Sequence, residues 1–571
     1  MAELTIVHVG DLHGHLVPRP NLRGDGTGRA EGGLAHLAAL LARIRAERPA
    51  TLLANTGDTI QGSAEALFTR GQALVDVVDR LGVDLFAPGN WDYLYGKERF
   101  LELFGPGTGS GPSGTRWGAV AANAYHAGTR DLLLPPYLVT EVAGLRVGVV
   151  GLSSERAINA LGPWVTEGIE FTDDAHEVPA HVRTLREDEG ADLVVLVSEF
   201  GLAKNVLIAE TNPGIDVVLS SDMHEETREC VVTSTGALVS EVGQDGTRLA
   251  RLDLTVEGGR VTGHRYRLHT VDAGTEPDPD VARLVEEVRA PFLAGAAFRT
   301  HVNPLNGAVL DRPIDDVIGR TEVGLHRSGF CGDGYPAAVE GTSHDFLSAA
   351  IREVAGTDVG HLRGFRYGTH VAPGPIRLED LYHYLPVGAQ LARTTVTGEQ
   401  LRQSLEGSAD GTFNPDPFRW TGGWVHAYAG VRYALDVYAD KGSRISAVQV
   451  RRGDGDWADL EPGARYTLAG YWYPKVPDKV GGIDGGDVTV LGRAGARARG
   501  SGGAADGPGT ADVVDVTEHV VDHLARHVVR AEEPRVRLVR PLPDRLWSFP
   551  EIQPLRGARQ VGSSPRRATP R

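Results

Sequence analysis

The chain has 571 residues and a formal net charge of -17, so at about 150 residues per domain we expect two to four domains. Hydrophobic residues make up 41% and charged residues 23%, which excludes a disordered, coiled-coil or collagen-like chain as the main state. The acidic balance makes nucleic acid a poor partner, although a local cluster of cations can still bind a small anion.

The two cysteines, Cys230 and Cys331, are too few for a disulfide scaffold. Neither has a His or Asp partner at a recognisable spacing, which disfavours a cysteine nucleophile. No stretch approaches the roughly 18 apolar residues of a membrane span, and residues 1–9 lack the basic start of a signal peptide. We therefore expect a cytoplasmic protein with no membrane partner, and the oligomeric state stays open.

The first half of the chain alternates short apolar runs with amphipathic stretches. Strands are expected at residues 4–9, 51–54, 85–87, 147–150, 193–197 and 217–219, and helices at residues 32–48, 73–81 and 176–187. This alternation predicts an α/β domain. In such a domain polar residues gather beyond the carboxyl ends of the strands, on loops that share one face.

The second half of the chain predicts a separate α+β domain. Strands near residues 250–256 and 263–269 precede an expected helix at 277–298, and another helix is expected around 343–354. The boundaries are placed at 1–272 for the first domain, 273–298 for a linker helix, 299–549 for the second domain and 550–571 for a disordered tail. The Gly/Ala/Arg-rich stretch 492–510 is expected to be a surface loop.

Residue types that bind metals follow four of the predicted strands. The clusters are Gly10-Asp11-Leu12-His13, Asn55-Thr56-Gly57-Asp58, Gly89-Asn90-Trp91-Asp92 and Ser221-Asp222-Met223-His224. One such cluster alone is as well explained by a capping Asp and an exposed His, but four in order favour a shared site. A carboxylate shared by two cations is how a two-metal hydrolase activates water and neutralises an anionic substrate.

These clusters resemble the motifs of the calcineurin-like metallophosphoesterases, and within them of the 5′-nucleotidase family. The resemblance implies an α/β fold with an N-terminal four-layer αββα sandwich and a C-terminal α+β nucleotidase-like domain that caps the metals. It also implies two divalent ions. The implied ligands of the first ion are Asp11, His13, Asp58 and His224, and those of the second are Asp58, which bridges, and Asn90.

In the second domain, Gly364-Phe365-Arg366-Tyr367-Gly368 resembles the substrate-binding motif of that family. Arg366 would present a planar fork to a phosphate or sulfonate, and the alternative is a surface ion pair. Within the family, other segments look most like the sulfur-oxidation thiosulfohydrolases. These segments include residues 69–72, 89–96, 413–417 and 442–446, and this likeness of ancestry does not settle the substrate.

Trp91 and Leu94 depart from the nucleotidase pattern. That pattern has a catalytic His directly after the metal-binding Asn and an Asp three residues later that orients it, so both members of the dyad are absent here. Loss of a general acid commonly costs about 10²–10⁴ in rate and matters most for a basic leaving group. Trp91 therefore favours a substrate whose leaving group needs little protonation, or else it simply packs against the next loop.

The second metal site is altered as well, because Glu199 and Asp222 stand where the family has histidines. If both carboxylates bind, the site favours Mn²⁺, Mg²⁺ or Fe²⁺ over Zn²⁺, and manganese is the preferred ion. The alternative is that this site has decayed and only the first metal binds. Asn123 is expected to support the metal loops, and His15 and His36 to face solvent or to support packing.

Two aromatic residues of the second domain point toward a nucleotide. Tyr428 and Tyr473 align with the two rings between which nucleotidases hold the base, and stacking is worth about 1–3 kcal/mol per base. The alternative is that both are ordinary strand aromatics.

The sequence thus predicts a binuclear metal-dependent phosphoric ester hydrolase that cleaves a nucleotide or related phosphoester with metal-activated water. Asp58 would bridge the cations, Asn90 would position an anionic oxygen, and Arg366 would hold the charged group of the substrate. One alternative is hydrolysis of an S-sulfonate or thiosulfonate, like that of the thiosulfohydrolases. Another is a binding protein that has lost catalysis.

Overall fold

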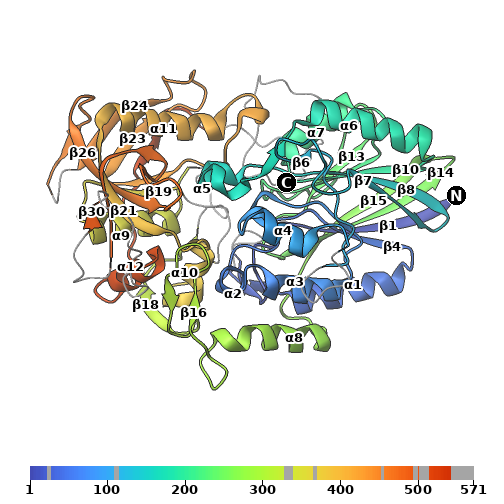
Figure 1. The fold of residues 1–571 in the computed structure, drawn as a ribbon, viewed down its shortest axis with the longest axis horizontal. Coiled ribbons are helices and arrows are strands. Elements are labelled where there is room, and N and C mark those ends of the chain that lie inside the picture. The colour runs from blue at the N-terminus through green and yellow to red at the C-terminus, as the bar shows by residue number, and fades with distance from the viewer. Residues whose placement is uncertain are drawn as a thin grey trace.

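The computed structural model describes residues 1–21, 28–107, 115–326, 339–363, 370–422, 424–451, 455–492, 499–500 and 513–541. Figure 1 shows two lobes side by side, the first half of the chain in blue to green and the second in yellow to red. Every helix among the described residues is too short or too polar to cross a membrane. The predicted tail at 550–571, and nearly all of the loop predicted at 492–510, lie outside the described residues.

The first lobe is built on two sheets. One has the strand order β15-β14-β1-β4-β5, in which β1 is parallel to β4 and antiparallel to β14; the other has the order β12-β13-β11-β10-β8-β7. The bounds are β1 (Ala2–Val9), β4 (Thr51–Asn55), β5 (Leu85–Phe86), β7 (Tyr137–Val142), β8 (Leu145–Leu152), β10 (Leu193–Ser198), β11 (Val217–Ser220), β12 (Val231–Val232), β13 (Leu238–Glu241), β14 (Arg248–Glu257) and β15 (Arg260–Thr270).

Helices cover the outer faces of both sheets. Leu34, Leu37 and Phe100 join the apolar cluster on the outside of the first sheet, and Val178 and Val206 join that on the outside of the second. A third apolar cluster, with residues such as Ile6 and Val195, fills the space between the sheets. The helices are α1 (Leu34–Glu47), α2 (Ala64–Phe68), α3 (Gln72–Val78), α4 (Lys97–Phe104), α5 (Ala157–Leu161), α6 (Asp174–Arg183) and α7 (Leu202–Thr211). The expected four-layer αββα sandwich is thus confirmed.

The linker helix is shorter than the sequence predicts. A helix was expected over 277–298, whereas α8 spans Pro279–Arg289 and continues only as a 3₁₀ turn to Phe292. Asp278 caps its start by accepting hydrogen bonds from the backbone nitrogens of Asp280 and Val281. The helix ends early because Pro291 has no N–H to donate to the preceding turn. Figure 1 shows α8 along the lower edge, beneath α1 and α3.

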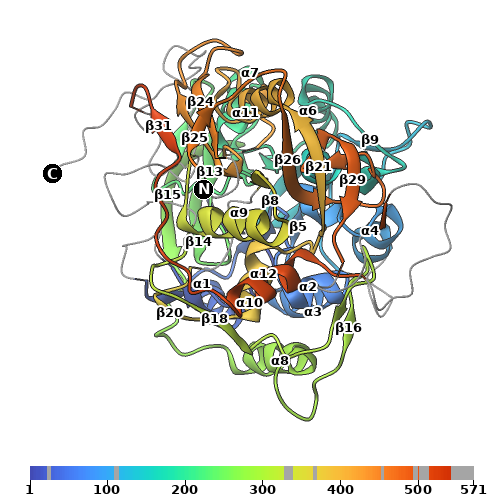
Figure 2. The same cartoon turned by 90° about the vertical axis from the view of Figure 1, so that its left-hand side faces the viewer.

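The second lobe contains a six-stranded sheet of order β22-β19-β26-β21-β29-β30 and a four-stranded sheet of order β25-β24-β23-β31. Figure 2, which looks onto this lobe, shows α9 (Thr342–Ala355) and α12 (Val516–Leu524) lying close together. The strands are β19 (Val359–Leu362), β21 (Gln390–Thr397), β22 (Ala427–Ala429), β23 (Val431–Leu435), β24 (Ile445–Arg451), β25 (Trp457–Asp459), β26 (Arg465–Trp472), β29 (Gly486–Val490), β30 (Arg499–Gly500) and β31 (Val536–Leu538).

The helices of this lobe are α9 (Thr342–Ala355), α10 (Leu378–Tyr384), α11 (Gly398–Phe413) and α12 (Val516–Leu524). The helix expected around 343–354 is therefore confirmed as α9. The remaining strands pair in short ribbons: β2 (Arg19–Pro20), β3 (Ala30–Glu31), β6 (Ala124–His126), β9 (Ile169–Phe171), β16 (His301–Val302), β17 (Val309–Leu310), β18 (Val317–Thr321), β20 (Gly374–Arg377), β27 (Lys479–Val480) and β28 (Ile483–Asp484).

Ion pairs join the two lobes. Arg19 of the first lobe contacts Glu379 at 3.0 Å and Asp380 at 2.7 Å, both on α10. Arg289 of α8 contacts Glu65 of α2 at 2.7 Å and the same Glu379 at 2.6 Å. These side chains are mostly shielded from solvent, so the pairs are screened less than surface pairs. They fix the second lobe against the edge of the first.

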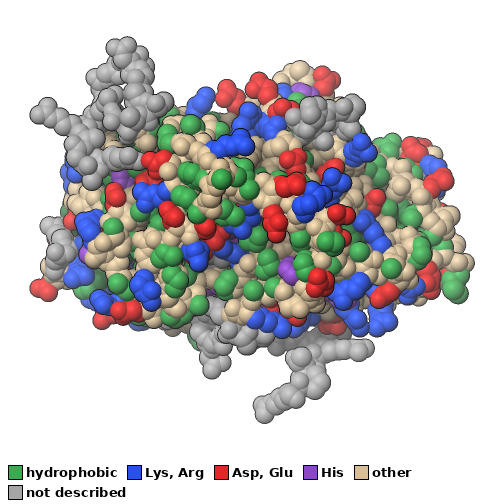
Figure 3. All heavy atoms as spheres, turned by 90° about the horizontal axis from the view of Figure 1, so that it is seen from below, with side chains coloured by type: hydrophobic (Ala, Val, Ile, Leu, Met, Phe, Trp, Pro, Cys, Tyr) green, Lys and Arg blue, Asp and Glu red, His purple; other side chains and the backbone are tan. Residues whose placement is uncertain are grey.

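The outer surface mixes charges of both signs. On the face seen in Figure 3, basic and acidic side chains are interspersed, with apolar side chains scattered among them. No single-sign field builds up over this face.

Candidate metal centre

Four of the predicted ligands follow three strands at one edge of the sandwich. Asp11 and His13 come after β1, Asp58 comes after β4, and His224 comes after β11. All four are buried, with exposed fractions of 0%, 0%, 1% and 3% respectively. Because β1 and β4 are parallel, their carboxyl ends meet at the same edge, as the sequence analysis required.

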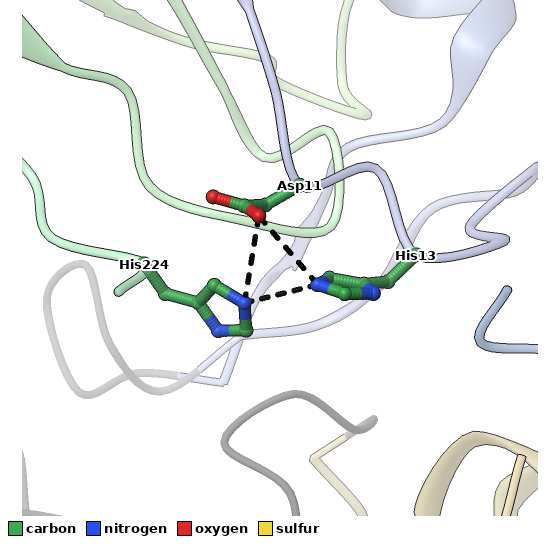
Figure 4. A group of neighbouring side chains, drawn as sticks. All are labelled: Asp11, His13 and His224. Atoms are coloured by element: carbon green, nitrogen blue, oxygen red, sulfur yellow. Dashed lines mark hydrogen bonds and ion pairs between the residues drawn. The ribbon is translucent and has the colours of Figure 1, made fainter. Parts of the chain in front are cut away.

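The side chains of Asp11, His13 and His224 point toward one another (Figure 4). The Nε2 atoms of His13 and His224 lie 2.9 Å apart. Each of these two nitrogens is 3.7 Å from Oδ1 of Asp11. Oδ2 of Asp58 is also 3.7 Å from Nε2 of His13. Ligand atoms bonded at about 2.1 Å to one ion lie roughly 3–3.4 Å apart, so this set fits a divalent cation after small adjustments.

The carboxylates at this centre are strongly perturbed. Burial, followed by the charges of Asp58, Glu241 and Asp222, raises the pKa of Asp11 well above its usual range. Burial and then the charge of Asp92 raise the pKa of Asp58 in the same way. A bound dication would reverse this effect, since it stabilises the ionised form of each ligand and displaces its proton.

Neighbouring groups hold the ligands in place. Nδ1 of His13 lies 3.3 Å from Oε1 of Gln61, which orients the ring so that Nε2 faces the centre. Oδ1 of Asp58 accepts a hydrogen bond from the backbone nitrogen of Trp91 at 2.8 Å. Asp92 accepts hydrogen bonds from the backbone nitrogens of Asp58 and Gly89 at 3.0 and 2.8 Å. The loops after β4 and β5 are therefore locked to each other.

Backbone conformation also marks this edge. Asp11, His13, Asp58, Asp222 and His224 all have positive φ, between 41° and 90°. Non-glycine residues adopt this left-handed region rarely and at a cost, and such residues concentrate at functional sites. The clustering of these conformations on the ligand loops therefore supports a functional centre here.

The second set of predicted ligands is arranged differently. The amide nitrogen of Asn90, rather than its oxygen, faces the carboxylates: Nδ2 donates to Oδ2 of Asp58 at 3.2 Å and to Oε1 of Glu199 at 2.7 Å. The backbone nitrogen of Asn90 donates to the other oxygen of Glu199 at 3.1 Å. The structure thus brings Glu199 to this edge, with both of its oxygens hydrogen-bonded to Asn90.

Asp222 has a partner that the sequence analysis missed. Nη1 of Arg156 donates to Oδ2 of Asp222, and the two side chains are 10% and 3% exposed. The backbone nitrogen of Asp222 donates to Oδ2 of Asp11 at 3.1 Å. Arg156 follows the carboxyl end of β8, in the same position relative to its strand as the predicted ligands. A search for cations at strand ends, and not only for ligand types, could have found it.

Trp91 and Leu94 take part in packing. Trp91 is 6% exposed, Leu94 is fully buried, and both belong to the apolar cluster that continues into the second lobe through Phe292, Leu378 and Leu381. The packing alternative for Trp91 is therefore supported by its environment. Neither side chain can supply the proton that the nucleotidase His–Asp dyad provides.

The two predicted substrate-binding tyrosines share a neighbour: burial raises the pKa of Tyr428 and of Tyr473, and the nearby Arg363 guanidinium opposes that rise in both. Tyr428 packs its ring 4.8 Å from that of His361 and shares a 2.7 Å hydrogen bond with Ser404. Tyr473 lines a pocket of about 220 Å³ between the lobes, together with Trp164, Trp472 and Lys475 among other residues. Arg366 lies outside the described residues. The base-stacking role of the two tyrosines stays a prediction.

The buried imidazole beside Tyr428 gives the second lobe a pH dependence. Burial lowers the pKa of His361 to about 3, so the folded chain holds it neutral while the unfolded chain takes up a proton below its ordinary value of about 6.5. Stability is full above pH 6.5 and falls as the pH decreases toward 3. We expect a loss of about 2 kcal/mol at pH 5 from this group.

Chemical denaturation at pH 7.5 and pH 5 measures this effect. The His361→Gln variant should lose about 2 kcal/mol less than the unaltered chain between these pH values. His264→Gln, on the exposed side of β15, is the matched control and should behave like the unaltered chain. An equal pH response in both variants would show that His361 is not the responsible group.

Three further residues can be placed. His15 is 2% exposed and stacks on His383 of the second lobe with ring centroids 4.2 Å apart, which confirms a packing role. Nδ2 of Asn123 donates to the backbone oxygen of Ser153 at 2.8 Å, and thereby supports the loop that leads to Arg156. Burial raises the pKa of the Cys230 thiol to about 12, which disfavours a nucleophile there. Cys331 lies outside the described residues.

Family models match both lobes. Residues 4–226 match the calcineurin-like phosphoesterase model, and residues 317–481 match the 5′-nucleotidase C-terminal domain. The first lobe thus matches a calcineurin-like phosphoesterase domain and the second a 5′-nucleotidase C-terminal domain. The two matches follow the order that the sequence predicts, and they cover the strand-end loops of the metal centre. The two-domain architecture inferred from the motifs is therefore confirmed.

Relatives of the protein include a probable 5′-nucleotidase of Treponema pallidum, which is 26% identical over 82% of this chain and 85% of that protein. The endonuclease YhcR of Bacillus subtilis is 23% identical over 81% of this chain. The chain spans only 36% of the length of YhcR. The match to the calcineurin-like phosphoesterase model, together with the relative named a 5′-nucleotidase, agrees with the predicted class of metal-dependent hydrolases of phosphoric esters.

A solved structure with the same fold is the sulfate thiohydrolase SoxB of Thermus thermophilus. It has a TM-score of 0.75 and 24% identity, and the match covers 97% of this chain and 99% of that one. A 5′-nucleotidase precursor of Thermus thermophilus has a TM-score of 0.73 and 21% identity, with 94% and 100% covered. At these identities the similarity establishes the fold of both lobes.

Proposed function

We propose that this protein hydrolyses a nucleotide or a related phosphoester with a good leaving group, using the centre formed by Asp11, His13, Asp58 and His224. The observation that carries the proposal is the convergence of two imidazole nitrogens and two carboxylates at one buried edge. A divalent ion held there would polarise the phosphoryl group and make water nucleophilic. The relatives named 5′-nucleotidases support the class of substrate.

The protein groups around the centre have separate tasks. Oδ2 of Asp58 lies 3.7 Å from Nε2 of His13 and accepts a hydrogen bond from Nδ2 of Asn90 at 3.2 Å. The amide of Asn90 is proposed to hold an anionic oxygen of the substrate, which requires that it release its hydrogen bond to Asp58 or to Glu199. Arg366 is proposed to bind the charged group of the substrate from the second domain.

The environment of Trp91 limits the leaving group. Its indole is buried among apolar side chains, so this position offers no acid to protonate a departing alkoxide. The cost of losing a general acid is about 10²–10⁴ for a basic leaving group and small for an acidic one. We therefore favour a phosphate anhydride or a phenolate over the 5′-oxygen of a ribose.

Hydrolysis of an S-sulfonate or thiosulfonate is the second candidate. The same observation favours it, because a sulfur leaving group also departs without protonation. The segment around Trp91, which resembles the thiosulfohydrolases, supports this candidate further.

The ligand atoms also bear on the metal. Two imidazole nitrogens with carboxylate oxygens suit Mn²⁺, Fe²⁺ or Zn²⁺ better than Mg²⁺, which prefers oxygen ligands and bound water. We propose manganese as the working ion, and the assays below begin with it.

The test is a release screen with the Mn²⁺-loaded full chain. Phosphate is measured from an aryl phosphate, a nucleoside diphosphate and a nucleoside monophosphate, and sulfate from a thiosulfonate. We expect kcat/KM for the aryl phosphate to exceed that for the nucleoside monophosphate by at least about a hundredfold. Equal rates for the two esters would contradict the leaving-group argument. Sulfate release alone would favour the second candidate, and a metal-loaded chain with no turnover would favour a binding protein.

A further inference from the structure

The position expected for the second metal ion departs furthest from the family pattern. The resemblance implies imidazoles where the chain has Glu199 and Asp222. Within the part of the chain that the structure describes, two clusters of acidic and histidine side chains converge closely enough to hold an ion. They are Asp11 with His13 and His224, and Glu353 with His523 and His527; neither includes Glu199 or Asp222. Both carboxylates instead face hydrogen-bond donors, because Asn90 donates to both oxygens of Glu199 and Arg156 donates to Oδ2 of Asp222. This arrangement of donors does not suit a second dication.

The guanidinium of Arg156 lies at this position and pairs with Asp222. Arg156 donates through Nη1 to Asp222, whose backbone nitrogen in turn donates to Asp11 at 3.1 Å. Arg156 is thus connected through Asp222 to Asp11, a ligand of the first site. The side chain of Arg156 is only 10% exposed to solvent. Its charge also reaches Asp58, where it opposes the rise in pKa caused mainly by burial.

The guanidinium and a second dication would exclude each other. Arg156 already holds Oδ2 of Asp222, and two cations a few ångströms apart in a buried site repel strongly. Glu199 is likewise engaged, because Asn90 donates to both of its oxygens. The change of a neutral imidazole to an aspartate is balanced in charge by Arg156, which random decay of a metal site would not produce.

One atom of Arg156 is left to bind a ligand. Nη2 is buried and has no hydrogen-bond partner among the described residues. A buried donor without a partner has lost its hydration with no compensating hydrogen bond, so such a donor is normally satisfied by water or a ligand. A guanidinium matches the geometry of a phosphate or sulfonate oxygen pair.

We propose that Arg156 replaces the second metal ion, so that the centre binds one divalent cation and uses the guanidinium to hold an anionic oxygen of the substrate. This inference rests on the proposed hydrolytic function for its substrate. The number of metal ions bound per chain, by contrast, can be measured without any turnover of substrate.

The first test is elemental analysis of the full chain after loading with Mn²⁺ and removal of loosely bound ions. We expect one ion per chain and the electron paramagnetic resonance spectrum of an isolated Mn²⁺ ion. A variant that combines Arg156→Ala, Glu199→His and Asp222→His restores the family ligand set. It should bind a second ion and show the spectrum of a coupled pair. Two ions in the unaltered chain, or one in the restored variant, would overturn the proposal.

The second test is Arg156→Gln, assayed with the aryl phosphate. Loss of one preorganised donor to the developing charge typically costs about 10²–10³ in rate, and we expect a fall in kcat/KM of that size with the first ion still bound. Arg186→Gln is the matched control, because it removes a similar arginine–aspartate pair, with Asp216, at the other end of β11. Equal activity of the two variants would overturn the role of Arg156 toward the substrate.

The two proposals fail in distinguishable ways. A chain that binds one ion but releases neither phosphate nor sulfate refutes the proposed function and leaves the metal count standing. A chain that binds two ions and releases phosphate refutes the role of Arg156 and leaves the proposed function standing.

Discussion

Replacement of Asp58 by Asn is expected to lower kcat/KM for an aryl phosphate by at least about a thousandfold. Asp58 is the carboxylate that faces His13 at 3.7 Å and Asn90 at 3.2 Å, so its loss weakens both the metal ligand set and the position of the amide. A metal contributes several kcal/mol to stabilisation of the transition state, and each 1.4 kcal/mol is worth about tenfold in rate. Steady-state kinetics together with elemental analysis measure the effect.

Asp84→Asn provides the control for this variant. Asp84 accepts a hydrogen bond from the backbone nitrogen of Leu53 at 2.8 Å, near the start of β5, so it serves the same sheet without reaching the ligand loops. We expect its activity to stay within a few-fold of the unaltered chain. If Asp58→Asn retained more than a tenth of the activity, the centre would not be the site of hydrolysis.

Replacement of Trp91 by Ala is expected to lower the free energy of unfolding by about 3–5 kcal/mol, the usual cost of removing a buried tryptophan. Trp91 lies in the apolar cluster that connects the first lobe to the second, so the cavity would open at the junction of the lobes. Denaturant unfolding, followed by a signal from each lobe, measures the loss.

The matched comparison is Trp457→Ala. Trp457 is partly exposed on β25 and contacts the Arg432 guanidinium at 4.6 Å from its ring centroid. We expect this variant to lose about 1 kcal/mol or less. A cost for Trp91→Ala no larger than that for Trp457→Ala would argue that Trp91 serves the substrate and not the packing of the lobes.

The sequence determined the elements of the first lobe and the places of the ligands. The apolar runs predicted at 4–9, 51–54 and 193–197 are β1, β4 and β10, within one or two residues at each end. This succeeds because a buried parallel strand is a local pattern, and because the strand-end rule converts several local patterns into one shared edge. Asp11, His13, Asp58 and His224 could be placed on this basis.

Only the tertiary structure decided how the altered positions are used. Arg156 and Asp222 are 66 residues apart in the chain, and Asn90 and Glu199 are 109 apart. No periodicity or motif spacing links residues at such separations, because their pairing depends on where the loops of different strands meet. The same holds for Trp91, whose packing depends on the docking of the second lobe. The sequence around a carboxylate does not tell whether the side chain binds a metal ion or pairs with a guanidinium. The surrounding fold decides which of these cations lies beside it.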